Sequence, residues 1–121
     1  MFCWRGQVSR MDVFPMSDKM LDLVAGRFRT LGEPYRLRIL QVLTRGAIRV
    51  GDLVEELSGN QPNVSKHLQI LHQAGIVGRR REGNGIVYSL NDPAIFRLCE
   101  LVHRNESRKR GRRATTEIAS Y

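Results

Sequence analysis

Between Gln61 and Asn84 the sequence gathers side chains that form directional hydrogen bonds or carry positive charge. They are Gln61, Asn63, Ser65, Lys66 and Gln69, followed by Arg79, Arg80, Arg81 and Asn84. Amide side chains can bond two atoms of a base edge at once, whereas lysine and arginine neutralise phosphates. The chemistry open to this set is therefore nucleic-acid recognition.

The acidic side chains and histidines show no arrangement typical of an enzyme. Asp52, Glu55 and Glu56 form no pair with a nucleophile, and no loop is spaced to cradle a phosphate. Cys3 and Cys99 lie far apart without CxxC spacing, so neither a disulfide framework nor a structural zinc site is predicted. We expect no enzymatic activity and no cofactor.

The charge of the chain favours a polyanionic partner. Twenty Lys and Arg stand against twelve Asp and Glu in 121 residues, which gives a net charge of +8. This length suits one domain. No apolar run approaches the roughly 18 residues of a membrane span, and the first ten residues lack the apolar core of a secretory signal. These features predict a cytoplasmic protein without a membrane segment.

Apolar residues recur with a helical period in four segments before Gly75. Ser17 and Asn60 are candidate N-caps, whereas Gly32 and Gly75 are candidate stops. Residues 1–16 show no period and are predicted to form an irregular arm. The predicted helices span about 17–31, 34–45, 50–57 and 61–74, the last two joined by a tight turn at 58–60.

Beyond Gly75 the period changes to two, which predicts a two-stranded hairpin with its tip at residues 83–85. Asp92 and Pro93 then begin a last helix. Its apolar pattern fades after Arg104, so residues 105–121 are predicted to be a basic, frayed or disordered tail that either contacts phosphates or only aids solubility. The predicted fold is mainly α with a small β-hairpin: a winged helix-turn-helix of five helices and a two-stranded wing over residues 17–104.

This order of elements predicts binding to double-stranded DNA. The helix at 61–74 fits the major groove, and the basic hairpin can follow the neighbouring backbone. Taken alone, the polar side of that helix is as well explained by a solvated surface, and a dimeric protein-binding module remains the alternative function. The first and last helices each carry an apolar stripe that needs a partner, which predicts a homodimer on an inverted-repeat operator.

The segments LGEPYRLRILQVL, NQPNVSKHLQILHQAGIV and GRRREGNGIVYSL resemble the ArsR/SmtB family of bacterial winged-helix repressors, from about Phe28 to His103. The resemblance implies a homodimer, built largely by the first and last helices, that leaves its operator when an inducer binds. It matches Gln61, Ser65 and Lys66 to positions that the family uses at the groove, and residues 80–84 to the wing.

The resemblance does not supply a known sensing site. The positions of the family's Cys-x-Cys metal site hold Arg49 and Gly51, and a cysteine needed for its thiol switch is replaced by Gln41. Of a second metal site only Asp92 is present. The other positions of that site hold Ala94, Asn105 and Arg108.

Cys99, His103 and Glu106 share one helical face at i, i+4 and i+7, and they are the sharpest remaining candidates for a sensing site. The plainer interpretation is that Cys99 is a small buried hydrophobe. A pairing of Cys99 with Cys3 would require the N-terminal arm to fold back. The sequence predicts no particular inducer.

Overall fold

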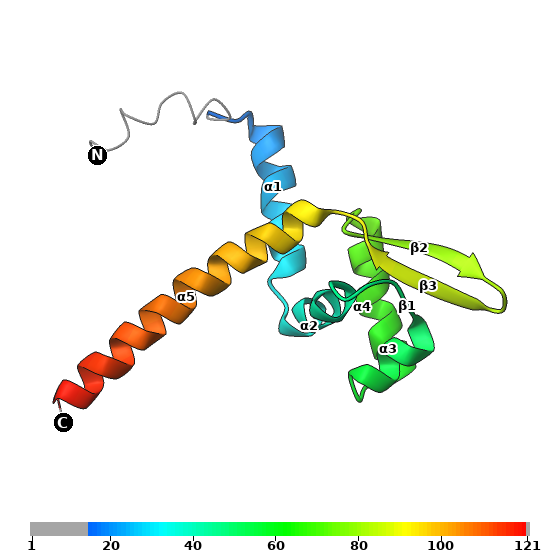
Figure 1. Ribbon diagram of the computed structural model, residues 1–121. Coiled ribbons are helices and arrows are strands. Elements are labelled where there is room, and N and C mark those ends of the chain that lie inside the picture. The colour runs from blue at the N-terminus through cyan, green and yellow to red at the C-terminus, as the bar shows by residue number, and fades with distance from the viewer. Residues whose placement is uncertain (1–14, 121) are drawn as a thin grey trace.

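Over residues 15–120, the part that the computed structural model describes, the chain folds into five helices and a three-stranded sheet (Figure 1). Side chains are described as far as Gly111. The predicted arm over residues 1–16, including Cys3, lies almost wholly outside this range. The elements are α1 (Asp18–Leu31), α2 (Pro34–Leu43), β1 (Ile48–Arg49), α3 (Val50–Glu56), α4 (Gln61–Gln73), β2 (Val77–Glu82), β3 (Gly85–Leu90) and α5 (Pro93–Ser120).

The predicted helix starts are confirmed by the hydrogen bonds of their capping side chains. Ser17 Oγ accepts from the Met20 amide at 3.1 Å, and Asn60 Oδ1 accepts from the Asn63 amide at 2.9 Å. Each bond satisfies an amide that has no partner within the first turn of its helix. These caps therefore fix where α1 and α4 begin.

The core lies around α4, whose inner face is fully buried. Val64, Leu68 and Leu71 repeat at helical spacing and pack in one cluster with Ile39 of α2 and Leu53 of α3. Most apolar side chains of α2 are buried in the same core, although Leu37 stays 40% exposed. Because α4 is held along one side, its other side has a fixed direction.

The sheet has one strand more than predicted. The strand order is β1-β3-β2, and β1 pairs antiparallel with β3 through Ile48 opposite Tyr88 and Arg49 opposite Val87. A two-residue strand is too short to show a period, so no local pattern predicted it. The hairpin itself is confirmed, with a two-residue turn in which Gly83 has φ +63°.

The last helix is longer than predicted, because α5 continues past Arg104 to Ser120. The prediction of a frayed or disordered segment is thus wrong for residues 105–120. Charged pairs along the helix stabilise this part: Glu100 lies 3.5 Å from Arg104, and Glu106 lies 3.6 Å from Lys109. Every described side chain from Glu100 onward is exposed.

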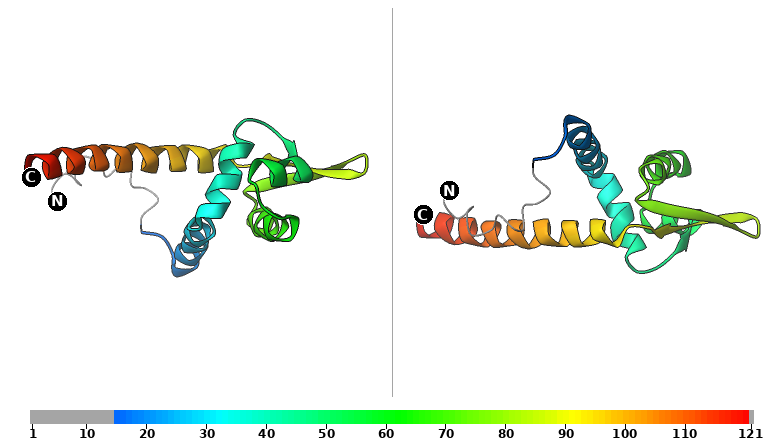
Figure 2. Two further views of the ribbon diagram at one scale, coloured as in Figure 1. Left: turned by 90° about the horizontal axis from the view of Figure 1, so that it is seen from below. Right: turned by 90° about the horizontal axis from the view of Figure 1, so that it is seen from above.

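Figure 2 shows that α5 and the β2–β3 hairpin extend from the domain in opposite directions. Within residues 15–120 no helix combines the length and the apolar character that crossing a membrane would require.

Candidate nucleic-acid interface

The turn between α3 and α4 is tight, and Tyr35 of α2 packs against it. Ser58 has a positive φ of 51°, and a side chain at Gly59 would collide with the Tyr35 hydroxyl. The Gly59 amide also donates to the carbonyl of Val54 at 3.1 Å. These constraints set the angle at which α4 leaves α3, which is the geometry of a helix-turn-helix.

The outward side of α4 carries the polar residues that the sequence singled out. Gln61, Lys66 and Gln69 are exposed, whereas Asn63 and Ser65 are half-buried. All five lie within the first nine residues of the helix, away from the buried stripe. The structure thus brings amide, hydroxyl and ammonium groups together on one accessible helix surface.

Two side chains that we did not single out hold α4 against α2. Arg36 donates from Nε to His67 Nδ1 at 3.1 Å, and the His67 ring lies 5.1 Å from the Tyr35 ring. Burial, and secondarily the charge of Arg36, lower the pKa of His67. A neutral His67 therefore accepts the Arg36 bond, and this buried ring helps to fix α4 against α2.

The β2–β3 hairpin, whose first strand carries the arginines, lies on the same side of the molecule as α3 and α4 (Figure 1). Arg79, Arg80 and Arg81 are exposed on β2, and Asn84 is exposed in the turn. An exposed arginine strand is well suited to follow a phosphate backbone.

Glu82 restrains two of the positive charges in this region. Its carboxylate lies 3.0 Å from Arg80 Nη2 and 3.6 Å from Arg49 Nη2 on β1. Arg49 also lies against Gly85, where a side chain would meet its guanidinium. No local pattern predicted Arg49 as part of the wing, because its contact with Glu82 depends on the pairing of β1 with β3.

A further arginine, Arg27 of α1, links three helices. It donates to the Ala74 carbonyl at the end of α4 and lies 2.9 Å from the Asp92 carboxylate. Asp92 also caps α5 by accepting from the Ala94 amide at 3.1 Å. The one residue retained from the family's second metal site is thus engaged in a structural ion pair.

The candidate sensing residues of α5 do not form a metal centre within the described part of the chain. No group of three His, Cys, Asp or Glu side chains is arranged there to hold a metal ion. Cys99 is half-buried against the core, His103 lies 3.4 Å from Ser107, and Glu106 pairs with Lys109. Burial raises the pKa of the Cys99 thiol, as expected for a packing residue.

A helix-turn-helix followed by a β-hairpin wing defines the winged helix-turn-helix class. Residues 33–78 match the family model described as "Bacterial regulatory protein, arsR family". The chain belongs to this family.

The similarity extends to solved structures. This chain is 33% identical in sequence to M. tuberculosis Rv0081. The match to the Rv0081 crystal structure has a TM-score of 0.73 and covers 81% of this chain and 99% of that one. The homodimeric winged helix-turn-helix DNA-binding domain of Mb0332 from Mycobacterium bovis is 31% identical, with a TM-score of 0.68 over 78% of this chain and 90% of that one.

A curated relative is the probable mercury resistance operon repressor of Streptomyces lividans, 40% identical over 80 residues. The match covers 66% of this chain and 64% of that relative, which is slightly less than two thirds of its length.

Proposed function

We propose that the chain is a homodimeric transcriptional repressor that binds operator DNA through α4 and the β2–β3 wing. The observation that carries this proposal is that α4 and the β2–β3 hairpin lie on the same side of the domain (Figure 1), while the polar residues of α4 and the arginines of β2 are accessible to solvent. A major groove about 12 Å wide accepts such a helix, while the wing reaches the adjacent backbone or minor groove. Membership of a family of bacterial regulatory proteins supports the same function.

The side chains divide into base-contacting and phosphate-contacting groups. We assign Gln61 and Asn63 to base edges, because amides bond bases bidentately. Ser65, Lys66 and Gln69 face phosphates or bases farther along the groove. The wing residues Arg79, Arg80, Arg81 and Asn84 contact the backbone.

Exposed apolar side chains on the first and last helices support the homodimer. They are Met20, Leu21, Leu23 and Phe28 on α1, with Leu101 and Val102 on α5. Large apolar side chains gathered on two helices are typical of an interface with another subunit. The homodimeric state of the Mb0332 domain supports the same assembly. A two-fold dimer would set two copies of α4 about one DNA turn apart, which requires an inverted-repeat operator.

In this proposal residues 17–104 form the DNA-binding and dimerisation domain, and the helical residues beyond them form a basic extension. Such a regulator acts on DNA in the cytoplasm, and we assign it no catalytic step and no cofactor. An inducer would release it from the operator.

The proposal is tested with an operator selected from random-sequence duplexes. Lys66→Ala should weaken binding to operator and random DNA alike, because it removes a phosphate contact. Gln61→Ala should lower the discrimination between them by roughly 1–3 kcal/mol. Gln41→Ala, which removes an exposed amide from α2, is the matched control and should change neither. Unchanged affinity and footprint in both α4 variants would contradict the assignment.

The alternative is a dimeric module that binds another protein, for which the basic surface is incidental. Displaced counterions make DNA affinity fall steeply with salt, with a log-log slope of about 0.9 for each neutralised phosphate. A shallow slope together with no preference for any selected duplex would favour the protein-binding module.

A further inference from the structure

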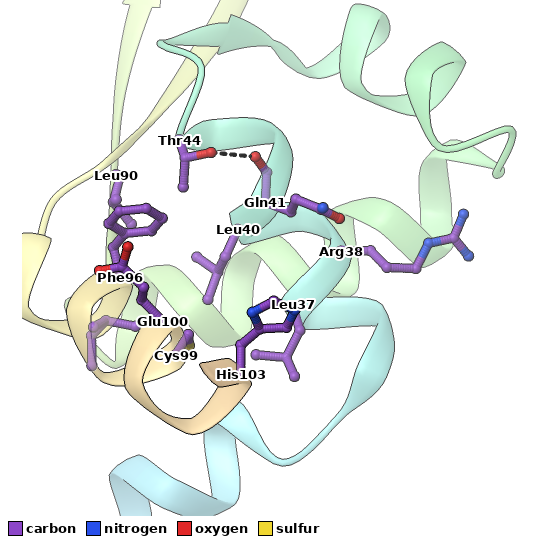
Figure 3. Close-up of a pocket in the computed structure, with 11 residues that line it drawn as sticks. Leu37, Arg38, Leu40, Gln41, Thr44, Leu90, Phe96, Cys99, Glu100 and His103 are labelled. Atoms are coloured by element: carbon purple, nitrogen blue, oxygen red, sulfur yellow. Dashed lines mark hydrogen bonds between the residues drawn. The ribbon is translucent and has the colours of Figure 1, made fainter. Parts of the chain in front are cut away.

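A cavity of about 440 Å³ lies between α2 and α5, outside the DNA-binding surface (Figure 3). Leu40 and Ile95 are buried in its wall, whereas Leu37 and Phe96 remain 40% and 45% exposed. This volume is within the range of small-molecule sites, which is about 300–1,000 Å³. Two large apolar side chains left half in water beside a cavity are stabilised when a ligand covers them.

The charges around the cavity are already compensated. Glu100 pairs with Arg104 at 3.5 Å, and the Arg38 guanidinium lies 5.9 Å from the centre of the Tyr35 ring. In Figure 3 Arg38 also extends away from the other labelled side chains. No single charge within the described lining is therefore arranged to neutralise an ionic ligand, which favours an uncharged one.

The polar groups of the lining favour a ligand with one hydrogen-bonding end. Gln41 and His103 supply an amide and an imidazole, which can donate to or accept from a hydroxyl or carbonyl group. Phe96 supplies an aromatic face near Thr44 and Leu90, and His103 lies near Leu37 (Figure 3). Cys99 also lines the cavity. Because burial raises the pKa of its thiol, the side chain is protonated and contributes an uncharged surface; it is not a reactive thiolate.

We propose that this cavity binds an uncharged aromatic molecule carrying one hydroxyl or carbonyl group, and that its occupancy weakens operator binding. The first half concerns the cavity alone. The second half rests on the proposed function, because it names the inducer class of that repressor.

The walls of the cavity connect directly to the DNA-binding elements. One wall is α2, which holds α4 through the Arg36–His67 hydrogen bond, and Leu90 of the lining ends the wing strand β3. The other wall is α5, whose first residues are tied through Asp92 and Arg27 to the end of α4. A ligand that changes the spacing of α2 and α5 therefore acts on α4 from both sides. It weakens DNA binding to the extent that it binds the DNA-free protein more tightly than the DNA-bound protein.

The first experiment uses 1-naphthol, an uncharged fluorescent aromatic alcohol, with the full chain and no DNA. Its fluorescence should change saturably with protein. Cys99→Phe, which fills the cavity, and Phe96→Ala, which removes the aromatic wall, should each weaken binding about tenfold. Leu101→Ala is the control: it truncates a more exposed apolar side chain on the same helix, outside the cavity, and should bind 1-naphthol normally. Should Cys99→Phe fail to fold, as judged by circular dichroism, Phe96→Ala decides.

Binding that does not saturate, or that is equal in all four proteins, would overturn the ligand site. Loss of the dimer in both Phe96→Ala and Cys99→Phe, measured by light scattering, would also overturn it by assigning the cavity to the subunit interface. The second experiment repeats the operator titration with saturating 1-naphthol, which should raise the Kd of the wild type and leave that of Cys99→Phe unchanged. An unchanged wild-type Kd refutes the inducer role, whereas failure to bind any operator without 1-naphthol refutes the proposed function and leaves the fluorescence result standing.

Discussion

Replacing Glu82 by glutamine should strengthen DNA binding, although it removes two ion pairs. In the free protein the Glu82 carboxylate lies 3.0 Å from Arg80 and 3.6 Å from Arg49, and it compensates positive charge on the wing. Both pairs are about half exposed, so their loss should change the free energy of unfolding by no more than about 1 kcal/mol. The variant should therefore fold normally and present two more available guanidinium groups.

The expected gain follows from counterion release. Each additional phosphate contact steepens the log-log salt dependence by about 0.9, which at 0.15 M salt corresponds to about 1 kcal/mol, or roughly fivefold in Kd. With one or two released arginines, the affinity for DNA should rise about 5- to 30-fold. Fluorescence anisotropy with a labelled random duplex and with the operator, over a roughly sixfold range of salt from about 50 to about 300 mM, measures both quantities.

The matched control is Glu100→Gln. It makes the same charge change and also releases an arginine, Arg104, but on α5, which extends away from the wing (Figure 2). Glu100→Gln should leave the salt slope unchanged. An equal gain in both variants would mean that only net charge matters, and no gain in Glu82→Gln would refute the assignment of the wing to the backbone.

Three further predictions concern the supports of α4. Asn60→Ala removes the side-chain cap of α4 and should lower the free energy of unfolding by about 1 kcal/mol in urea titrations, whereas Asn105→Ala on exposed α5 should have little effect. Because the pKa of His67 is lowered on folding, stability should be full above the ordinary value of 6.5 and fall as the pH drops below it; the fall should be smaller in His67→Gln, and equal curves would contradict the argument. Arg27→Met should weaken operator binding more than the fall in its melting temperature would suggest. Losses of operator affinity and of melting temperature in proportion would show that the Arg27 link to α4 is only structural.

Local signals made most of the fold predictable. The caps at Ser17 and Asn60 and the apolar repeat of α4 each depend on residues within one or two turns of the chain. The same repeat showed which side of α4 is polar, so the polar set from Gln61 to Gln69 was found without the structure. That these residues contact DNA stays a prediction.

What the sequence did not supply depends on contacts between distant segments. Arg27 and Asp92 are 65 residues apart, and Arg49 reaches Glu82 only because β1 joins the sheet. The end of α5 was misjudged for another reason: the apolar stripe stops at Val102, but a helix rich in charged residues continues without one when neighbouring turns form ion pairs. The cavity was also not predicted, because it forms where α2 meets α5, two helices that are separated in the sequence by α3, α4 and the wing.

The exposed part of α5 also has a consequence for how the protein can evolve. A helix rises 1.5 Å per residue, so α5 is about 42 Å long, and its described side chains beyond Val102 contribute nothing to the core. Substitutions there therefore cost little stability, and selection can alter the charge of this segment in small steps. Descendants of this chain could diverge in this segment while retaining the same recognition helix.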